Sequence, residues 1–290
     1  MSDTDTLLRF LFERTDVRGN LVHLDASWRA VLDAHDYPEP VRGLLGEALA
    51  AVSLLAATIK FDGSLILQAQ GDGPLRTLVA QATNTHKVRG LARWDATLDP
   101  DATLTELFGQ GRLVLTVEPR VGEPYQGIVA LQGERLSEAL EHFFSGSEQL
   151  PTRLWLAADA ERAAGLLLQR LPSAAREADD WSRVGMLAAT LSREELLELP
   201  AEQLLYRLFN EEPVRLFEPE PIAFRCGCSR ARIEQTVKLL GADEIEALLA
   251  ERGALEVNCE FCNRTYHFDP VDARQLLAED SHHTPPSQHQ

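Results

Sequence analysis

The sequence predicts an α+β protein: an N-terminal domain of helices around a mixed or antiparallel sheet, a helical middle segment and a small C-terminal four-cysteine domain. Three observations support this prediction. Strand-like and helix-like segments mix over the first 172 residues without a regular βαβ rhythm. The composition then shifts to a stretch rich in Leu, Glu and Ala. All four cysteines lie between residues 226 and 262, in two close pairs.

The first domain is expected to span residues 1–172. Leu7–Arg14 fits either a helix or a strand, and Val17–Asp25 partly alternates as a strand does. Val41–Lys60 is apolar over most of a helical circumference and predicts a long buried helix. The other expected helices are Trp28–His35 with Ser27 as its N-cap, Leu75–Ala82, Leu104–Phe108 and Leu136–Ser145. The other expected strands are one within Phe61–Pro74, Val88–Arg93, Arg112–Glu118, Tyr125–Leu131, Arg153–Ala158 and Ala164–Leu171.

Residues 173–220 are expected to form a helical linker region. Ser192 and Glu195 match a capping box, and Pro200 separates two short helices, Ser192–Leu199 and Ala201–Asn210. Helices this short need packing against a neighbour to be stable. Prolines at 213, 219 and 221 mark the passage into the cysteine region, residues 221–280. The polar tail, residues 281–290, has the composition of a disordered segment.

Composition and charge exclude several classes of protein. The formal net charge is −17, and Pro221–Gln290 carries 7 basic against 11 acidic residues. A general nucleic-acid binder needs a basic face, so no nucleic-acid partner is expected. The N-terminus has no basic segment followed by an apolar one, and the apolar run Ala48–Ile59 is too short to cross a bilayer. We therefore expect a cytoplasmic protein without a membrane partner, in a compartment where thiols stay reduced.

The four cysteines predict a metal site. Cys226 and Cys228 form a C-x-C pair, and Cys259 and Cys262 form a C-x-x-C pair. Thirty residues separate Cys228 from Cys259. Structural zinc takes four tetrahedral ligands, and thiolates suit it well. Helices at Ser229–Leu240 and Asp243–Arg252, with strands at Leu255–Cys259 and Thr265–Phe268, would support the two pairs. So small a module would depend on its metal for folding.

Other uses of these thiols stay open on spacing alone. The zinc site could be purely structural, with no further role. A metal-free redox dithiol is less favoured, because the sequence does not place the C-x-x-C pair between a strand and a helix as a thioredoxin-like protein does. His267 could replace one cysteine as a ligand, since zinc also accepts imidazole. Histidines of the tail, at 282, 283 and 289, are expected to be solvated.

A four-thiolate site in a reducing cell can also be opened by an oxidant. Thiolates are nucleophilic, and formation of one disulfide removes two ligands at once. The folding free energy supplied by the metal is then lost. The arrangement could therefore couple oxidation, metal release and unfolding.

The cysteine pattern and several other segments resemble the family of redox-regulated heat-shock chaperonins of thirty-three kilodaltons. These segments occur in the family's order, and the resemblance covers nearly the whole chain. They are HDYPEPV (35–41), ATIKFDG (57–63), QGDGPL (70–75), RGLAR (89–93), YQGIVAL (125–131), SEQLPTRL (147–154), LLQRLP (167–172) and FNEEPVRLFEP (209–219). All four cysteines match the positions of the family's ligands.

The resemblance implies an ATP-independent holdase, not an enzyme, that binds one Zn²⁺ per chain through Cys226, Cys228, Cys259 and Cys262 when reduced. Oxidation would form the disulfides Cys226–Cys228 and Cys259–Cys262, release the zinc and loosen the linker. The active form would be a homodimer that binds unfolding client proteins during oxidative stress. Clients would afterwards pass to ATP-dependent foldase chaperones.

Apolar stripes on the linker helices are the predicted client-binding surface. In the reduced state we expect them to pack on the N-terminal sheet, and released they would present apolar area within an acidic frame. The stripes consist of Val184, Leu187, Leu191, Leu196, Leu197, Leu204, Leu205, Leu208 and Phe209. Two rival functions remain: a zinc-ribbon nucleic-acid factor, which the acidic charge disfavours, and a thiol–disulfide oxidoreductase, in which tight zinc binding would silence the cysteines.

Overall fold

The structure is a computed structural model that describes residues 5–95, 97–148, 150–172 and 178–280. The chain divides into two compact units, Met1–Arg225 and Cys226–Gln290. Both units combine helices and antiparallel strand pairs, which confirms the predicted α+β class. The tail expected to be disordered, 281–290, and the first residues of the expected linker, 173–177, lie outside the described residues.

The first sheet has six antiparallel strands in the order β10-β1-β2-β9-β8, with β11 also paired to β1. The strands are β1 (Thr6–Phe12), β2 (Val17–Leu24), β8 (Thr152–Ala158), β9 (Ala163–Arg170), β10 (Val214–Leu216) and β11 (Glu220–Pro221). Segments from the start, middle and end of the unit therefore lie side by side, and β8 forms one edge of the sheet.

The second sheet also has six strands, in the order β12-β5-β4-β3-β6-β7. They are β3 (Gly63–Gln70), β4 (Leu75–Thr83), β5 (Lys87–Trp94), β6 (Arg112–Pro119), β7 (Tyr125–Ala130) and β12 (Ala223–Phe224). Its consecutive strands pair antiparallel, and only β12 runs parallel to its neighbour, β5.

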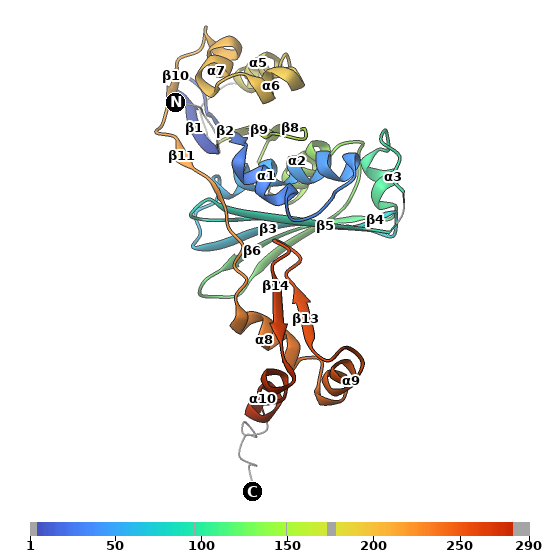
Figure 1. The fold of residues 1–290 in the computed structure, drawn as a ribbon. Helices are drawn as coiled ribbons and strands as arrows, with labels where there is room; N and C mark the ends of the chain where they lie inside the picture. Colours follow the sequence, from blue (N-terminus) through green and yellow to red (C-terminus); the bar gives the residue numbers. More distant parts are fainter. Residues whose placement is uncertain (1–4, 96, 149, 173–177, 281–290) are drawn as a thin grey trace, which may run out of the picture. The chain divides into compact units, whose positions relative to one another are not determined.

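Helices α1 (Ala26–Leu32) and α2 (Glu39–Ala56) lie between the two sheets (Figure 1). An unbroken run of α2, Ala48–Ala56, is buried, because the helix meets strands of both sheets. We call the apolar cluster around α2 the first core. It also takes in α3 (Leu104–Phe108) and α4 (Leu136–Phe143), and the π-helical turn Phe144–Glu148 follows α4 directly.

Three helices cover the other face of the first sheet: α5 (Ala178–Ala188), α6 (Arg193–Glu198) and α7 (Ala201–Phe209). They form the second core with the outer side chains of β1, β2, β8 and β9. All nine residues of the predicted stripes belong to this cluster or pack against it; Leu187 and Leu191 are the two only partly buried. The expected packing of the linker helices on the N-terminal sheet is therefore confirmed.

The helix predicted at Leu75–Ala82 is wrong, since this segment is strand β4. Leu75, Leu78 and Ala82 recur at spacings that suit a helix, and this misled the prediction. The backbone of β4 instead pairs with β3 on one side and β5 on the other. Pairing with two strands and burial against α2 outweigh the local preference.

The predicted N-cap of the first helix is also wrong. Helix α1 begins after Asp25, and Ser27 lies inside it. The side chain of Asp5 accepts backbone N–H bonds from Asp25, Ala26 and Ser27 at 2.9–3.1 Å. A carboxylate from another segment thus satisfies the free N–H groups of the helix and complements its dipole.

The proline-rich passage after α7 forms strands where a linker was predicted. Residues 214–224 supply β10, β11 and β12, which pair along the edges of both sheets. Pro221 lies in β11, and an edge strand tolerates a residue without an N–H group.

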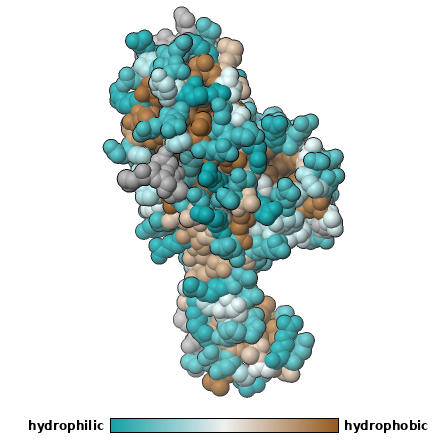
Figure 2. Space-filling view, turned by 45° about the horizontal axis from the view of Figure 1, so that its top comes forward, coloured by the Kyte–Doolittle hydropathy of each residue, from teal (hydrophilic) through white to brown (hydrophobic). Residues whose placement is uncertain are grey.

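The second unit has a two-stranded hairpin, β13 (Leu255–Asn258) and β14 (Thr265–Phe268), and three helices. Helices α8 (Arg230–Lys238) and α9 (Ala242–Arg252) were predicted, whereas α10 (Pro270–Asp280) was not. Among the described residues no helix is long and apolar enough to cross a membrane. Hydrophilic residues dominate the visible face of the molecule, with apolar residues in small groups between them (Figure 2).

Candidate metal centre

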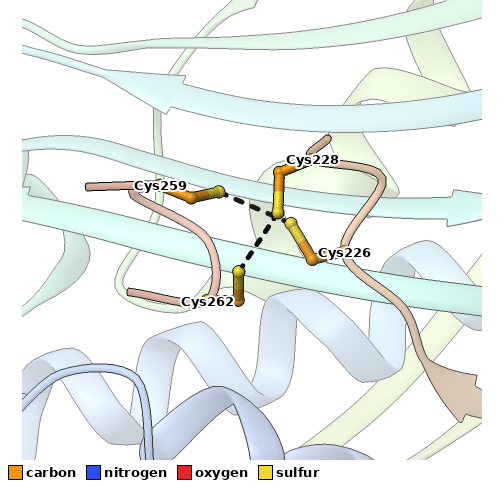
Figure 3. A group of neighbouring side chains, drawn as sticks. All are labelled: Cys226, Cys228, Cys259 and Cys262. Atoms are coloured by element: carbon orange, nitrogen blue, oxygen red, sulfur yellow. Dashed lines mark hydrogen bonds between the residues drawn. The ribbon is translucent and has the colours of Figure 1, made fainter. Parts of the chain in front are cut away.

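Two short segments of the second unit bring the four cysteines together. Cys226 and Cys228 lie in the extended stretch before α8, and Cys259 and Cys262 lie in the turn between β13 and β14. The four sulfur atoms lie within 4.8 Å of one another (Figure 3). Two close separations join the two segments: Cys226 Sγ to Cys259 Sγ is 3.5 Å, and Cys228 Sγ to Cys262 Sγ is 3.4 Å.

The C-x-x-C turn is fixed by backbone hydrogen bonds around Cys259. The N–H groups of Cys262 and Asn263 both donate to the Cys259 carbonyl, at 3.3 and 2.7 Å, and the Cys259 N–H donates to the Arg264 carbonyl at 3.0 Å. Asn263 has a φ of 52°, a left-handed conformation that Asn tolerates better than most residues. The turn therefore holds both thiols on the same side of the hairpin end.

The C-x-C segment is held by the start of α8. Ser229 is the N-cap of α8, and its Oγ accepts a hydrogen bond from the Arg232 N–H at 3.3 Å. The Arg232 guanidinium reaches back to the Gly227 carbonyl, between the two cysteines, at 2.9 Å. These bonds orient the first pair toward the hairpin turn.

The thiols share one local electrostatic environment. Burial raises the pKa of Cys226 to about 12. Burial acts in the same direction on Cys228, but hydrogen bonds from the Tyr266 hydroxyl and the other three thiols outweigh it and lower its pKa to about 7. The cluster therefore stabilises a thiolate at Cys228 even before a metal ion adds its positive charge.

A small apolar cluster, the third core, surrounds the site. Its buried members include Val237, Ile245, Leu249 and Phe268, and Cys259 itself is buried among them. The other three cysteines pack against this core. The metal-ligand candidates are therefore part of the packing of the unit.

Two neighbouring residues behave differently from what the sequence suggested. His267, considered as an alternative ligand, points away from the cluster: its side chain is 66% exposed and its Nδ1 lies 3.1 Å from Glu256 Oε1. Tyr266 was missed, although its hydroxyl donates to Cys228 Sγ at 3.2 Å. Only its place on the strand after the C-x-x-C turn could have indicated this contact, since no motif marks it.

Four thiols at these separations could bind one metal ion, and the ligand set is consistent with zinc. A tetrahedral ion with Zn–S bonds of about 2.3 Å requires sulfur–sulfur separations of about 3.8 Å. Two of the separations, 3.4 and 3.5 Å, lie slightly below that value, and the others do not exceed 4.8 Å. The fold and the site thus define an α+β chain with a C-terminal four-cysteine module of the metal-binding kind.

Comparison with known proteins identifies the family. The Hsp33 protein family matches residues 5–269. A 33 kDa chaperonin of Nitrosococcus oceani is 60% identical over 279 residues, 96% of each chain, and one of Azotobacter vinelandii is 51% identical over 285 residues, again 96% of each. The crystal structure of a 33 kDa chaperonin from Thermotoga maritima superposes with a TM-score of 0.85 at 23% identity, over 96% of this chain and 99% of that one, which shows the shared fold. The chain belongs to the Hsp33 family of chaperones.

Proposed function

We propose that this protein is an ATP-independent holdase that is switched on by oxidation of its four cysteines. The observation that carries the proposal is the cluster of all four sulfur atoms within 4.8 Å, built from two segments of a small unit. Family membership supports the chaperone activity. The cluster supports the redox control, because a site made only of thiols is the kind that an oxidant can dismantle.

In the reduced state, Cys226, Cys228, Cys259 and Cys262 would hold one Zn²⁺ per chain as thiolates. Bound there, the ion would neutralise thiolate charge, and its four ligands would join the C-x-C segment to the hairpin turn, thirty residues further along the sequence. The third core is small, and its cysteines contribute to it. Removal of the ion would therefore destabilise the whole unit.

Oxidation would convert the ligands into two disulfides, Cys226–Cys228 and Cys259–Cys262. For each disulfide, two thiolates lose two electrons to one peroxide, which takes up two protons and becomes two waters. A disulfide sulfur is no longer a thiolate ligand, so the module loses the bonds that fold it. Local pairing is consistent with the position of each pair on a single short segment.

The client-binding surface would be the apolar stripes of α5, α6 and α7 with the turn between α5 and α6, which the first sheet covers in the resting state. Their release would present Val184, Leu187, Leu191, Leu196, Leu197, Leu204, Leu205, Leu208 and Phe209 to unfolding chains. The net charge of −17 would keep the complexes apart by repulsion. By the family resemblance, the activated protein would be a homodimer in the cytoplasm that hands clients to ATP-dependent foldases.

One experiment joins the two halves of the proposal. The reduced, zinc-loaded protein is treated with peroxide at elevated temperature while zinc release is followed with a colorimetric chelator. Light scattering of a thermally aggregating client is followed in parallel. We expect about one zinc per chain, as one four-ligand site requires, and protection of the client only after its release. If zinc leaves and the client still aggregates, the zinc site is only structural and the proposed redox control is refuted.

A variant in which all four cysteines are replaced by serine distinguishes the holdase function from that of a thiol–disulfide oxidoreductase. A holdase would lose its dependence on oxidant, whereas an oxidoreductase would lose turnover of a disulfide substrate. Wild-type turnover of such a substrate, abolished in the variant, would favour the oxidoreductase.

A further inference from the structure

A cavity of about 400 Å³ runs along the edge of β8 in the first unit. Helices α2 and α4 belong to the first core and α6 to the second, so they lie on opposite faces of the first sheet. Side chains from both faces line this one cavity: Glu47, Arg135 and Ser137 on one side, and Leu191, Arg193 and Leu196 on the other. A cavity that touches both faces must pass around the sheet edge, and that edge is β8.

The register of β8 shows which backbone groups face the cavity. The Arg170 N–H donates to the Pro151 carbonyl at 2.9 Å, so the odd-numbered residues of β8 exchange hydrogen bonds with β9. The even-numbered residues direct their N–H and C=O groups away from β9. The Leu154 N–H obeys this rule, because it donates to Glu141 Oε1 at 2.8 Å.

Two side chains cover the ends of the exposed edge. Glu141 of α4 accepts the Leu154 N–H, and the Arg193 guanidinium of α6 donates to the Ala158 carbonyl. Between them, no described residue bonds the Leu154 carbonyl or either backbone group of Leu156. These open groups are spaced at the two-residue repeat of a strand, about 7 Å, which suits an extended backbone.

The two walls of the cavity differ in chemistry. On the side of α2 and α4, the carboxyl group of Glu47 has no hydrogen-bond partner among the described residues, and Arg135 and Arg193 act on its charge. On the side of α6, Leu191, Leu196 and Trp155 form an apolar wall. The side chains of a bound strand alternate between two faces, so one face would meet polar groups and the other apolar groups.

We propose that the β8 edge between Glu141 and Arg193 binds an extended polypeptide segment as an added strand, with alternating apolar and polar side chains. This inference rests on the proposed function, because unfolding clients supply such segments. Main-chain hydrogen bonds would give affinity for many sequences, as strand addition does elsewhere. Undocking of α6 would remove Arg193 from the Ala158 carbonyl and lengthen the open edge by one acceptor.

The test uses the whole protein, reduced and oxidised, and a fluorescent eight-residue peptide of alternating valine and threonine. The matched probe is the same peptide N-methylated at its four central residues, which keeps the side chains and removes the donors at both edges. We expect binding of the parent peptide, tighter after oxidation, and a loss on the order of tenfold or more with the methylated one. Equal binding of the two peptides, or no binding of either, would overturn the inference.

Variants of Leu156 locate the site on the protein. Leu156→Pro deletes an N–H that points into the cavity and leaves the ladder to β9 intact, a position where an edge strand accepts proline. Leu156→Val is its matched control, since it keeps the N–H and suits a strand. Peptide binding should fall on the order of tenfold in the first variant and stay unchanged in the second. Unchanged binding by a folded Leu156→Pro protein would exclude this edge, and the methylated peptide still decides if that variant does not fold.

A client-aggregation assay with oxidised wild-type protein separates this inference from the proposed function. Protection of the client, together with equal binding of the two peptides, would overturn only the strand-addition site. Failure to protect the client would refute the holdase function, whatever the peptides do.

Discussion

The hydroxyl of Tyr266 donates a hydrogen bond of 3.2 Å to the sulfur of Cys228. Tyr266 lies on β14 and its ring is buried in the third core, so the hydroxyl is held in place by packing. A donor to sulfur stabilises the thiolate relative to the thiol. The contact therefore links the fold of the hairpin to the charge state of the cluster.

Tyr266→Phe keeps the ring and removes this donor. We expect the variant still to bind zinc but to release it to peroxide about 2–10-fold faster, because one hydrogen bond to the cluster is lost. Release is measured with a chelator, and His267→Ala, on the exposed side of the same strand, is the control. An unchanged rate would mean that the tyrosine serves only the packing.

The pairing of the disulfides is open to direct mapping. Trypsin cuts after Arg225, Arg230, Arg252 and Arg264, so it places Cys226 and Cys228 in one peptide and Cys259 and Cys262 in another. The proposed local disulfides leave these peptides separate, each lighter by two hydrogens. Two sulfur pairs that join the two segments, however, are only 3.5 and 3.4 Å apart. Mass spectra dominated by the two peptides joined together would therefore contradict local pairing.

The ring of Phe209, at the end of α7, packs against the first sheet. Its ring lies 5.0 Å from that of Phe12 and 6.2 Å from that of Phe10, and it is 2% exposed. Phe209→Ala should cost about 3–5 kcal/mol of packing and loosen α7. The reduced variant should then suppress client aggregation without oxidant, and hydrogen exchange in α7 should rise.

Tyr206→Ala is the matched control for Phe209. Tyr206 lies on the same helix but is 74% exposed, so its loss should change neither exchange nor chaperone activity. A Phe209→Ala protein with fast exchange in α7 but no activity before oxidation would show that docking of α7 is not what restrains client binding.

The raised pKa of Glu47 predicts that the folding stability of the first unit depends on pH. Burial raises its pKa from 4.5 to about 7, and Arg193 and Arg135 oppose the shift only in part. Between these two values the unfolded chain loses the proton while the folded chain keeps it. Folding stability from this group is therefore full below pH 4.5 and lost as pH rises through 7, by about 3 kcal/mol.

Glu47→Gln should remove this loss. We expect the variant to gain stability relative to wild type at pH 8 but not at pH 4.5, measured by denaturant unfolding. Glu202→Gln, at an exposed position of α7, is the control. Its difference in unfolding stability from wild type should be the same at pH 8 and at pH 4.5. A wild-type minus variant difference that is flat with pH would exclude a raised pKa at Glu47.

Features that depend on residue type and short spacing could be predicted from the sequence alone. Four cysteines in two close pairs indicate a four-ligand cluster wherever the chain carries them, because each pair spans one turn. The apolar run within α2 and the stripe on α7 likewise indicate buried helical faces, since their period is that of a helix.

Features that depend on partners far away in the sequence became visible only in the folded chain. Leu75–Thr83 is a strand because β3 and β5 pair with it on both sides, and α1 is capped by Asp5 from another segment. The contact of Tyr266 with Cys228 and the cavity along β8 likewise join segments far apart in the sequence. Hydrogen bonds and packing between such segments leave no periodic trace in the local sequence, so local patterns could not predict them.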